Sequence, residues 1–268
     1  MTPGGLPLRY LSLTQADFTD RTTPGNGKIE MSKFEKTRWT ENEFSRNYRD
    51  DANIYLPFRS QFFEITKSFY EHFISQNIKA KILDLGCGDG LFIQELLKSF
   101  APAMVTLVDG SIEMLEAAKK RLGNQANLHF MQASFQELFT NDTLTEHFDF
   151  IYSSLAMHHL PFDEKKKLYT LIHKHLSPGG HFVHYDVVVS SVEQLEKWYL
   201  SLWRQWILQH LAEERREELL GIPNQYKSNR DNIPDTLDSQ LEALEQIGFK
   251  NVDCYFKYGI FSLFGGSK

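Results

Sequence analysis

The loop at residues 84–90 carries the clearest chemical signal in the sequence. The apolar run Ile82–Leu85 contains Asp84 and leads into Gly86, Gly88 and Gly90. Glycines at alternate positions let the backbone turn sharply and let a ligand approach without a Cβ in the way. A dinucleotide fold prefers G-x-G-x-x-G, whose third glycine and helix N-terminus serve a pyrophosphate. The acidic residue and the closer spacing favour instead a ligand with a cationic amine.

A second acidic residue, Asp109, follows the next apolar run in Leu107-Val108-Asp109-Gly110-Ser111. A carboxylate there can bind two ribose hydroxyls by charge-assisted hydrogen bonds. A ribose acid about 20 residues after the glycines also occurs in NAD enzymes, so Asp109 alone indicates only a nucleoside ligand. The alternative is that Asp109 caps the helix expected at Ser111–Leu122.

The elements that must position these residues alternate regularly along the chain. Runs typical of strands are Lys81–Leu85, Met104–Val108, Leu128–Met131, Phe148–Tyr152 and Phe182–Val188, and runs typical of helices are Leu91–Ser99, Ser111–Leu122 and Asp163–Leu176. This order predicts right-handed βαβ units and a parallel sheet, which binds ligands at the carboxyl ends of its strands. Pro178-Gly179-Gly180 predicts a sharp break before the fifth strand.

The remaining segments predict one domain with additions. Residues 1–35, rich in Gly and Pro, are expected to form a flexible N-terminal extension, and residues 36–268 the domain. Pro57 suits the first turn of a helix. Residues 191–235 predict a helical insertion that can act as a lid, helical to about residue 220 and a loop from Gly221 to Asp235. A helix at Leu237–Ile247 and strands at Val252–Lys257 and Ile260–Gly265 complete the chain.

Four segments in this order resemble the motifs of class I S-adenosylmethionine-dependent methyltransferases, across roughly residues 38–268. They are Asp84–Gly90, Val108–Leu115, Phe148–Leu160 and Leu176–Phe182. The resemblance implies an α/β, Rossmann-like, seven-stranded sheet that is mostly parallel, with an antiparallel last strand and helices on both faces. It also implies S-adenosyl-L-methionine as the cofactor.

The resemblance further suggests which residues contact this cofactor. They are Asp84, Gly86, Gly88, Gly90, Asp109, Gly110, Met114, Ser134, Phe135 and Ser153, with Tyr48 and Arg59 from the segment that covers the cofactor in many relatives. One position departs from the family, which usually has Asp where this chain has Ser134. That Asp accepts a hydrogen bond from the adenine amino group, and a neutral hydroxyl gives a bond about half as strong.

The acceptor side offers candidates for acid–base catalysis after the fourth and fifth strands: His158, His159, Tyr152 and Asp186. A base is needed only if the acceptor loses a proton, because the methyl donor is already activated. The alternative for the histidine pair is a loop packed on the core. Six of the ten histidines lie between residues 158 and 184, but their spacing on helix and strand points them apart, so no metal site is expected.

A second resemblance concerns the C-terminal third, which is similar to tRNA wobble-uridine modifying enzymes that use carboxy-S-adenosylmethionine. Arg230 would correspond to the arginine that holds the extra carboxylate, and a solvated loop arginine is the alternative. The prediction is transfer of a methyl group to a small-molecule acceptor. The rival functions are the tRNA modifier, a cofactor-binding protein without activity and an NAD-dependent oxidoreductase.

Composition narrows the partners. The net charge of −6 argues against nucleic acid held on a broad basic surface. The two cysteines, Cys87 and Cys254, are too few for a disulfide framework, so the cytoplasm is the expected compartment. No run approaches the ~18 apolar residues of a membrane span. Tyr199, Trp203 and Trp206 share one helical face, which indicates core or homodimer packing or, alternatively, an acceptor pocket.

Overall fold

A computed structural model describes residues 52–268 with the exception of 53, 142, 211–215 and 227–228. The expected N-terminal extension and Tyr48 therefore lie outside the described residues.

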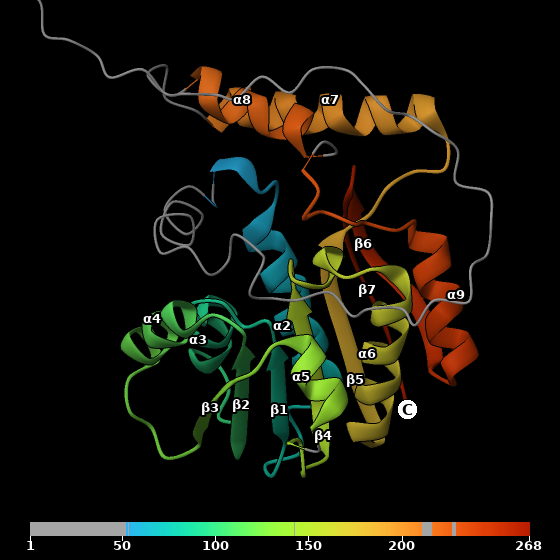
Figure 1. Cartoon of the computed structure of the whole chain (residues 1–268). Helices are drawn as coiled ribbons and strands as arrows, with labels where there is room; N and C mark the ends of the chain where they lie inside the picture. The colour runs from blue at the N-terminus through green and yellow to red at the C-terminus, as the bar shows by residue number, and fades with distance from the viewer. Residues whose placement is uncertain (1–51, 53, 142, 211–215, 227–228) are drawn as a thin grey trace, which may run out of the picture. The chain divides into compact units, whose positions relative to one another are not determined.

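The sheet has seven strands in the order β3-β2-β1-β4-β5-β7-β6 (Figure 1). Their bounds are β1 Lys81–Leu85, β2 Met104–Asp109, β3 Leu128–Gln132, β4 Phe148–Ser154, β5 Leu176–Val187, β6 Lys250–Tyr258 and β7 Phe261–Ser267. The first five strands are parallel, and β7 runs antiparallel to both of its neighbours. The predicted α/β fold with an antiparallel last strand is confirmed.

Helices cover both faces of the sheet, because neighbouring strand residues point to opposite sides. Ile82 packs in one apolar cluster with Phe62 and Ile93, whereas Leu83 packs in the other with Leu168. The first face carries α2 Arg59–Phe73, α3 Leu91–Leu97 and α4 Ile112–Leu122, and the second carries α5 Phe135–Thr140, α6 Phe162–His175 and α9 Leu237–Ile247. This arrangement leaves the carboxyl ends of β1 to β5 at one edge of the sheet (Figure 1).

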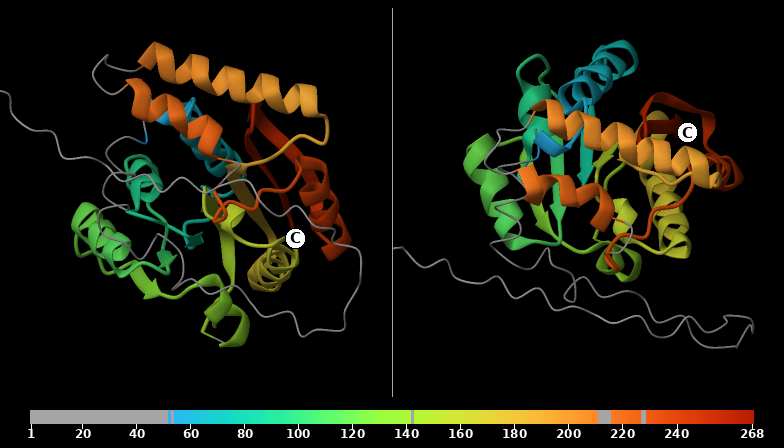
Figure 2. Two further views of the ribbon diagram at one scale, coloured as in Figure 1. Left: turned by 45° about the horizontal axis from the view of Figure 1, so that its top comes forward. Right: turned by 90° about the horizontal axis from the view of Figure 1, so that it is seen from above.

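The insertion after β5 forms two packed helices, α7 Glu193–His210 and α8 Arg216–Gln225 (Figure 2). The predicted loop starts later than Gly221, since α8 continues through Gly221 and Pro223 to Gln225. Leu219 and Tyr226 are buried in and just beyond α8. Burial of apolar side chains thus outweighs the weak helix propensity of glycine and proline.

Two tryptophans of α7 fasten the insertion to the segment before α2. The indole Nε1 of Trp203 donates to the Tyr55 carbonyl at 2.6 Å, and that of Trp206 donates to the Ile54 carbonyl at 3.1 Å. Trp203 is 4% exposed. These two side chains therefore take part in core packing.

Two boundaries differ from the sequence predictions. The expected break at Pro178-Gly179-Gly180 lies inside β5, because a register shift between Phe148 and Phe150 absorbs it and Gly180 accepts a hydrogen bond from the Lys268 amide at 3.0 Å. Pro57 precedes α2, which begins at Arg59 after Phe58 adopts a left-handed conformation (φ 54°).

Candidate functional site

The glycine loop after β1 takes a conformation that side chains disfavour. Gly86, Gly88 and Gly90 have φ angles of 68°, 54° and 72°. A Cβ on Gly86 would lie 2.4 Å from the Cβ of Ala156, so the fold itself requires glycine there. No atom of the described residues lies within 4 Å of a Cβ placed on Gly88. The space beside Gly88 is therefore open to a ligand.

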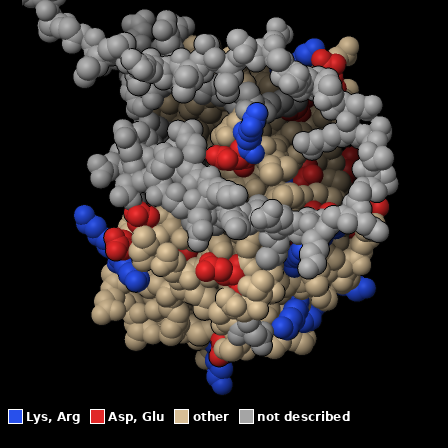
Figure 3. All heavy atoms as spheres, viewed as in Figure 1, with Lys and Arg blue, Asp and Glu red and all other residues tan. Residues whose placement is uncertain are grey.

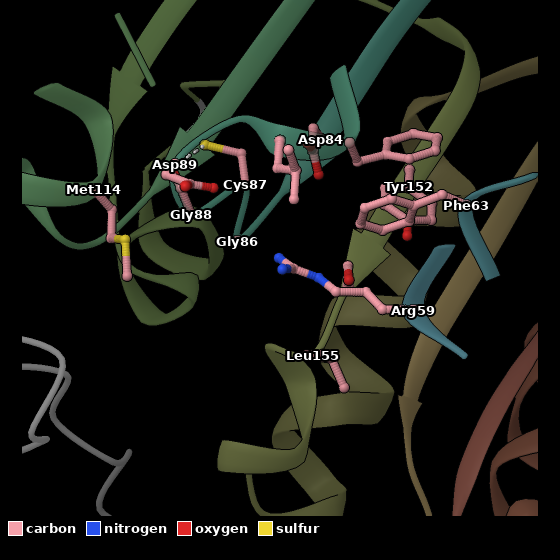
Figure 4. Close-up of a pocket in the computed structure, with 13 residues that line it drawn as sticks. Arg59, Phe63, Asp84, Gly86, Cys87, Gly88, Asp89, Met114, Tyr152 and Leu155 are labelled. Atoms are coloured by element: carbon pink, nitrogen blue, oxygen red, sulfur yellow. Dashed lines mark hydrogen bonds between the residues drawn. The ribbon is translucent and has the colours of Figure 1, made fainter. Parts of the chain in front are cut away.

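A pocket opens beside this loop (Figure 4). Its walls come from the start of α2, the end of β1, the starts of α3 and α4, and the end of β4. The lining residues are Arg59, Phe63, Asp84, Gly86, Cys87, Gly88, Asp89, Leu91, Phe92, Met114, Tyr152, Ser154 and Leu155. Six of the residues predicted from the sequence meet here: Arg59, Asp84, Gly86, Gly88, Met114 and Tyr152.

Asp84 places a buried carboxylate in the wall of the pocket. It is 2% exposed, and its Oδ1 has no hydrogen-bond partner among the described residues. Burial, and to a lesser extent the charge of Asp109, raise the pKa of Asp84 well above its ordinary value. An unpartnered buried carboxylate is costly, and a cationic ligand group would offset that cost.

Asp109 at the end of β2 holds the glycine loop. Its Oδ2 accepts a hydrogen bond from the Gly88 amide at 2.8 Å, and its Oδ1 accepts one from the Ser111 amide at 2.8 Å. Burial raises the pKa of Asp109 to about 6, although these two hydrogen bonds act in the opposite direction. The residue that caps α4 is Ser111, whose Oγ accepts from the Met114 amide, so the alternative role of Asp109 as the helix cap is wrong.

Arg59 faces this acidic wall from α2. Figure 4 shows its guanidinium reaching into the pocket, with Tyr152 and Phe63 on one side and Asp84 across from it. The guanidinium carbon lies 5.6 Å from the centre of the Phe63 ring. Tyr152 is fully buried, and burial raises the pKa of its hydroxyl. Opposite charges on facing walls suit a ligand that carries both an amine and a carboxylate, as an amino acid does.

The acidic and imidazole groups of the acceptor side form a separate cluster. His158 follows β4, Asp186 ends β5, and His158 Nδ1 lies 2.6 Å from Asp186 Oδ1. Neither residue lines the pocket of Figure 4. His159 Nδ1 lies 2.7 Å from the Asp231 carbonyl oxygen. Burial, with a smaller contribution from the charge of His158, lowers the pKa of His159 to about 3.

A short segment of the insertion lies against this histidine pair. The Ile233 amide donates to the His158 carbonyl at 2.7 Å, and the Val189 amide donates to the Asp235 carbonyl at 3.1 Å. Lys165 of α6, which is 1% exposed, donates to the Ile233 carbonyl at 2.6 Å and pairs with Asp235. Residues 231–236 therefore lie at the carboxyl ends of β4 and β5.

The comparisons with known proteins agree with this geometry. Residues 82–180, which include the glycine loop and both histidines, match the family described as a methyltransferase domain. This part of the chain is therefore similar to a methyltransferase domain, in line with the resemblance to class I S-adenosylmethionine-dependent methyltransferases. An O-methyltransferase family protein from Burkholderia thailandensis shares the fold, with a TM-score of 0.58 and 12% identity over 87% of this chain and 62% of that one.

Two relatives differ in how much of the chain they match. Malonyl-[acyl-carrier protein] O-methyltransferase 1 of Ilyobacter polytropus is 32% identical over 99 residues, 37% of this chain. The chain spans about a third of that relative's length (35%). Carboxy-S-adenosyl-L-methionine synthase of Nautilia profundicola is 22% identical over 243 residues, which is 88% of this chain and 97% of the relative.

The other residues predicted from the methyltransferase motifs lie outside the pocket lining. Ser134 caps α5, since its Oγ accepts from the Glu137 amide at 3.3 Å and donates to the Glu137 carboxylate at 2.8 Å. Ser153 is fully buried and donates to the Leu85 carbonyl at 2.8 Å. Gly90 caps α3. Gly110 follows β2, and the Phe135 ring lies 3.4 Å from a Cβ placed on Gly86.

One positioning contact in the methyltransferase domain gave no signal in the sequence. Arg121 of α4 donates to the Asp89 carbonyl at 2.9 Å, pairs with the Asp89 carboxylate and donates to Gln94 at 3.1 Å. It therefore binds the glycine loop and α3 to the end of α4. The Asp-x-Gly-x-Gly-Asp-Gly sequence shows the carboxylate of Asp89, but its partner is 32 residues away.

Three further features of the described residues concern surface charge, metal-binding groups and membrane-spanning helices. On the face in Figure 3, basic and acidic side chains are interspersed among the described residues. Within the described ranges, no three His, Cys, Asp or Glu side chains are grouped so as to hold a metal ion. Among the same residues, no helix is long and apolar enough to cross a membrane.

Proposed function

We propose that this chain binds S-adenosyl-L-methionine in the pocket of Figure 4 and transfers its methyl group to a small-molecule acceptor. The observation that carries the proposal is the buried Asp84 carboxylate with its unpartnered Oδ1, facing Arg59 across the open side of the glycine loop. The amino-acid part of this cofactor has the amine and the carboxylate that two such walls can hold. The residues present therefore fit the group.

The proposal gives roles to several of the predicted cofactor residues. Asp84 would accept from the amine, and Arg59 would donate to the carboxylate. Each oxygen of Asp109 accepts one backbone hydrogen bond and keeps a second lone pair, which a ribose hydroxyl can use. Met114 and Phe135 offer apolar surface for the adenine. The hydroxyl of Ser134 is engaged by Glu137, which supports only a weak polar contact with the base.

The acceptor is assigned to the carboxyl ends of β4 and β5. Once bound, the cofactor supplies an activated methyl group, so the protein has to place the acceptor in line and exclude water. His158, paired with Asp186, is the candidate for receiving a proton from the acceptor. His159 donates its Nδ1–H to the Asp231 carbonyl, because a carbonyl can only accept. Tyr152 stays a neutral phenol in the pocket wall.

Isothermal titration with S-adenosylmethionine, S-adenosylhomocysteine and NAD tests the proposal. We expect both sulfur ligands to bind with micromolar or tighter affinity, and NAD to give no heat above dilution, because the third dinucleotide glycine is replaced by Leu91. NAD binding without a response to S-adenosylhomocysteine would refute the proposal. Binding of the cofactor without methylation of any acceptor would leave the cofactor-binding protein as the function.

A second candidate ligand is carboxy-S-adenosylmethionine. It is favoured by the similarity over 88% of the chain to a carboxy-S-adenosyl-L-methionine synthase and by the guanidinium of Arg59 in the pocket. Arg230, the residue expected to hold the extra carboxylate, is exposed and does not line the pocket. Competition between the two sulfonium ligands at one concentration of protein decides which is preferred. The tRNA-modifying alternative gains no support from the charges in Figure 3.

The setting of the enzyme also belongs to the proposal. Both Cys87 and Cys254 are free thiols, which supports a reducing compartment such as the cytoplasm. A homodimer stays a prediction. Its support is Trp198 of α7, which is 54% exposed.

A further inference from the structure

The carboxylate of Asp186 lies between two histidine rings. His158 Nδ1 is 2.6 Å from its Oδ1, and His184 Nε2 is 3.0 Å from its Oδ2. The Val187 amide donates a third hydrogen bond to Oδ1 at 2.9 Å. Asp186 is 1% exposed. A buried carboxylate so placed has both of its oxygens fixed.

The ionised state of Asp186 sets the direction of these hydrogen bonds. Burial would raise the pKa of Asp186, but the pairing with His158 and then with His184 more than offsets burial and holds this pKa well below its ordinary value. A carboxylate can only accept. Nδ1 of His158 and Nε2 of His184 therefore both carry the hydrogen. In the neutral rings, Nε2 of His158 and Nδ1 of His184 are left without one.

His184 is the less expected of the two rings. It is fully buried, and its ring lies among the rings of Phe182, Phe264 and Tyr169. Its Nδ1 has no hydrogen-bond partner among the described residues. A hydrogen on Nδ1 would thus be a buried donor without an acceptor, which costs free energy. An apolar ring would fit these aromatic neighbours better, so the feature that histidine adds over such a ring is the Nε2–H donor.

The spacing on β5 explains how this donor reaches Asp186. Residues two apart on a strand lie on the same face, so His184 and Asp186 project side by side. His158 approaches the other oxygen from the short helical turn Met157–His159 after β4. Asp186 is therefore braced at Oδ2 from its own strand, while its Oδ1 meets His158 of the loop after β4.

We propose that His184 is a positioning residue that braces Asp186, so that Asp186 holds His158 with Nδ1–H inward and with Nε2 free to take a proton from the methyl acceptor. The inference rests on the proposed methyl transfer for the role of that proton. The orientation of the rings does not depend on it. The arrangement suits an acceptor whose attacking atom is a hydroxyl oxygen or an amine nitrogen.

Long-range ¹H–¹⁵N correlation spectra of the ¹⁵N-histidine-labelled full chain at about pH 8 test the arrangement without any acceptor. We expect His158 as the Nδ1–H form and His184 as the Nε2–H form, each favoured by roughly tenfold or more, as a hydrogen bond to a charged group allows. A wild-type His158 with its hydrogen on Nε2 would overturn the inference, whether or not any variant folds.

Two substitutions at one position separate positioning from packing. In His184→Gln the amide nitrogen can take the place of Nε2, so His158 should still carry its hydrogen on Nδ1. In His184→Phe the donor is lost, and the preference of His158 for Nδ1–H should fall several-fold. If His158 prefers Nδ1–H as strongly in His184→Phe as in the wild type, His184 only fills the core. His181→Phe, on the same strand and outside this cluster, is the matched control.

Titration of the same samples with S-adenosylhomocysteine keeps the two proposals apart. If the wild type does not bind S-adenosylhomocysteine, the proposed function is refuted, but the ring orientations can still be as inferred. If the wild type binds it and His158 carries its hydrogen on Nε2, only the inference on His184 is refuted.

Discussion

Replacing Asp84 by asparagine should change ligand affinity and thermal stability in opposite directions. The substitution keeps the shape of the side chain and removes its charge. In the unliganded protein the carboxylate is 2% exposed with Oδ1 unpartnered, and its pKa is raised chiefly by burial. A neutral amide avoids that cost, so Asp84→Asn should be at least as stable as the wild type toward thermal unfolding.

The ligand should respond in the opposite direction. A hydrogen bond between a buried carboxylate and a cationic amine contributes about 1.5–3 kcal/mol. Since ~1.4 kcal/mol is a factor of ten, the Kd for S-adenosylhomocysteine should rise roughly 10- to 150-fold. The raised pKa gives this effect a pH dependence, because Asp84 must be ionised to bind the amine. Affinity of the wild type should therefore fall as the pH is lowered, and Asp84→Asn should show less of this fall.

Isothermal titration and thermal unfolding of the same samples measure the two effects. Glu164→Gln is the matched control, since Glu164 is also 2% exposed but lies on α6, outside the pocket, where it accepts from Gln136 at 2.8 Å. The control should leave the Kd unchanged. An unchanged Kd in Asp84→Asn, or a fall of stability and affinity together, would show that Asp84 serves the fold and not a ligand.

Four other variants test the glycine loop, Asp109 and the attachment of the insertion. Gly88→Ala should lose cofactor affinity at a stability cost of only about 1–2 kcal/mol for its left-handed φ, whereas Gly86→Ala should unfold at a much lower temperature because its Cβ meets Ala156 at 2.4 Å. The pKa of Asp109 is raised to about 6, so its neutral form favours the unliganded fold. That stabilisation is lost as the pH rises from about 4 to about 6. In Asp109→Asn the melting temperature should therefore change less over this pH range. Trp203→Phe removes a 2.6 Å hydrogen bond to a buried carbonyl and should lower the free energy of unfolding by about 1–3 kcal/mol in denaturant titration.

The sequence pattern predicted the part of the site that is formed by β1 and the glycine loop after it. Asp84 and the glycines lie next to one another in sequence, and a parallel sheet brings its strand ends to one edge. The regular alternation of runs was enough to predict the sheet. The Pro178–Gly180 segment misled, because its pairing with Lys268 depends on a strand that comes 80 or more residues later.

The contacts that join distant elements could not be predicted in the same way. Arg121 meets Asp89 across 32 residues, and His158 meets Asp186 across 28. Each pairing depends on the relative placement of helices and strands, which periodicity does not encode. Of the contacts around Asp186, the one with His184 could have been predicted from the sequence, since residues two apart on a strand share a face.

The place of β7 in the sheet has a consequence for how the chain folds during synthesis. β7 pairs with β5 along seven residues and separates it from β6, yet it is translated after the other six described strands. Until Phe261–Ser267 has left the ribosome, the outer edge of β5 therefore has no strand to pair with. An unpaired, apolar edge invites pairing with other chains. Nascent chains stalled before residue 261 should thus depend on chaperones, and chains stalled after β7 has emerged should depend on them less.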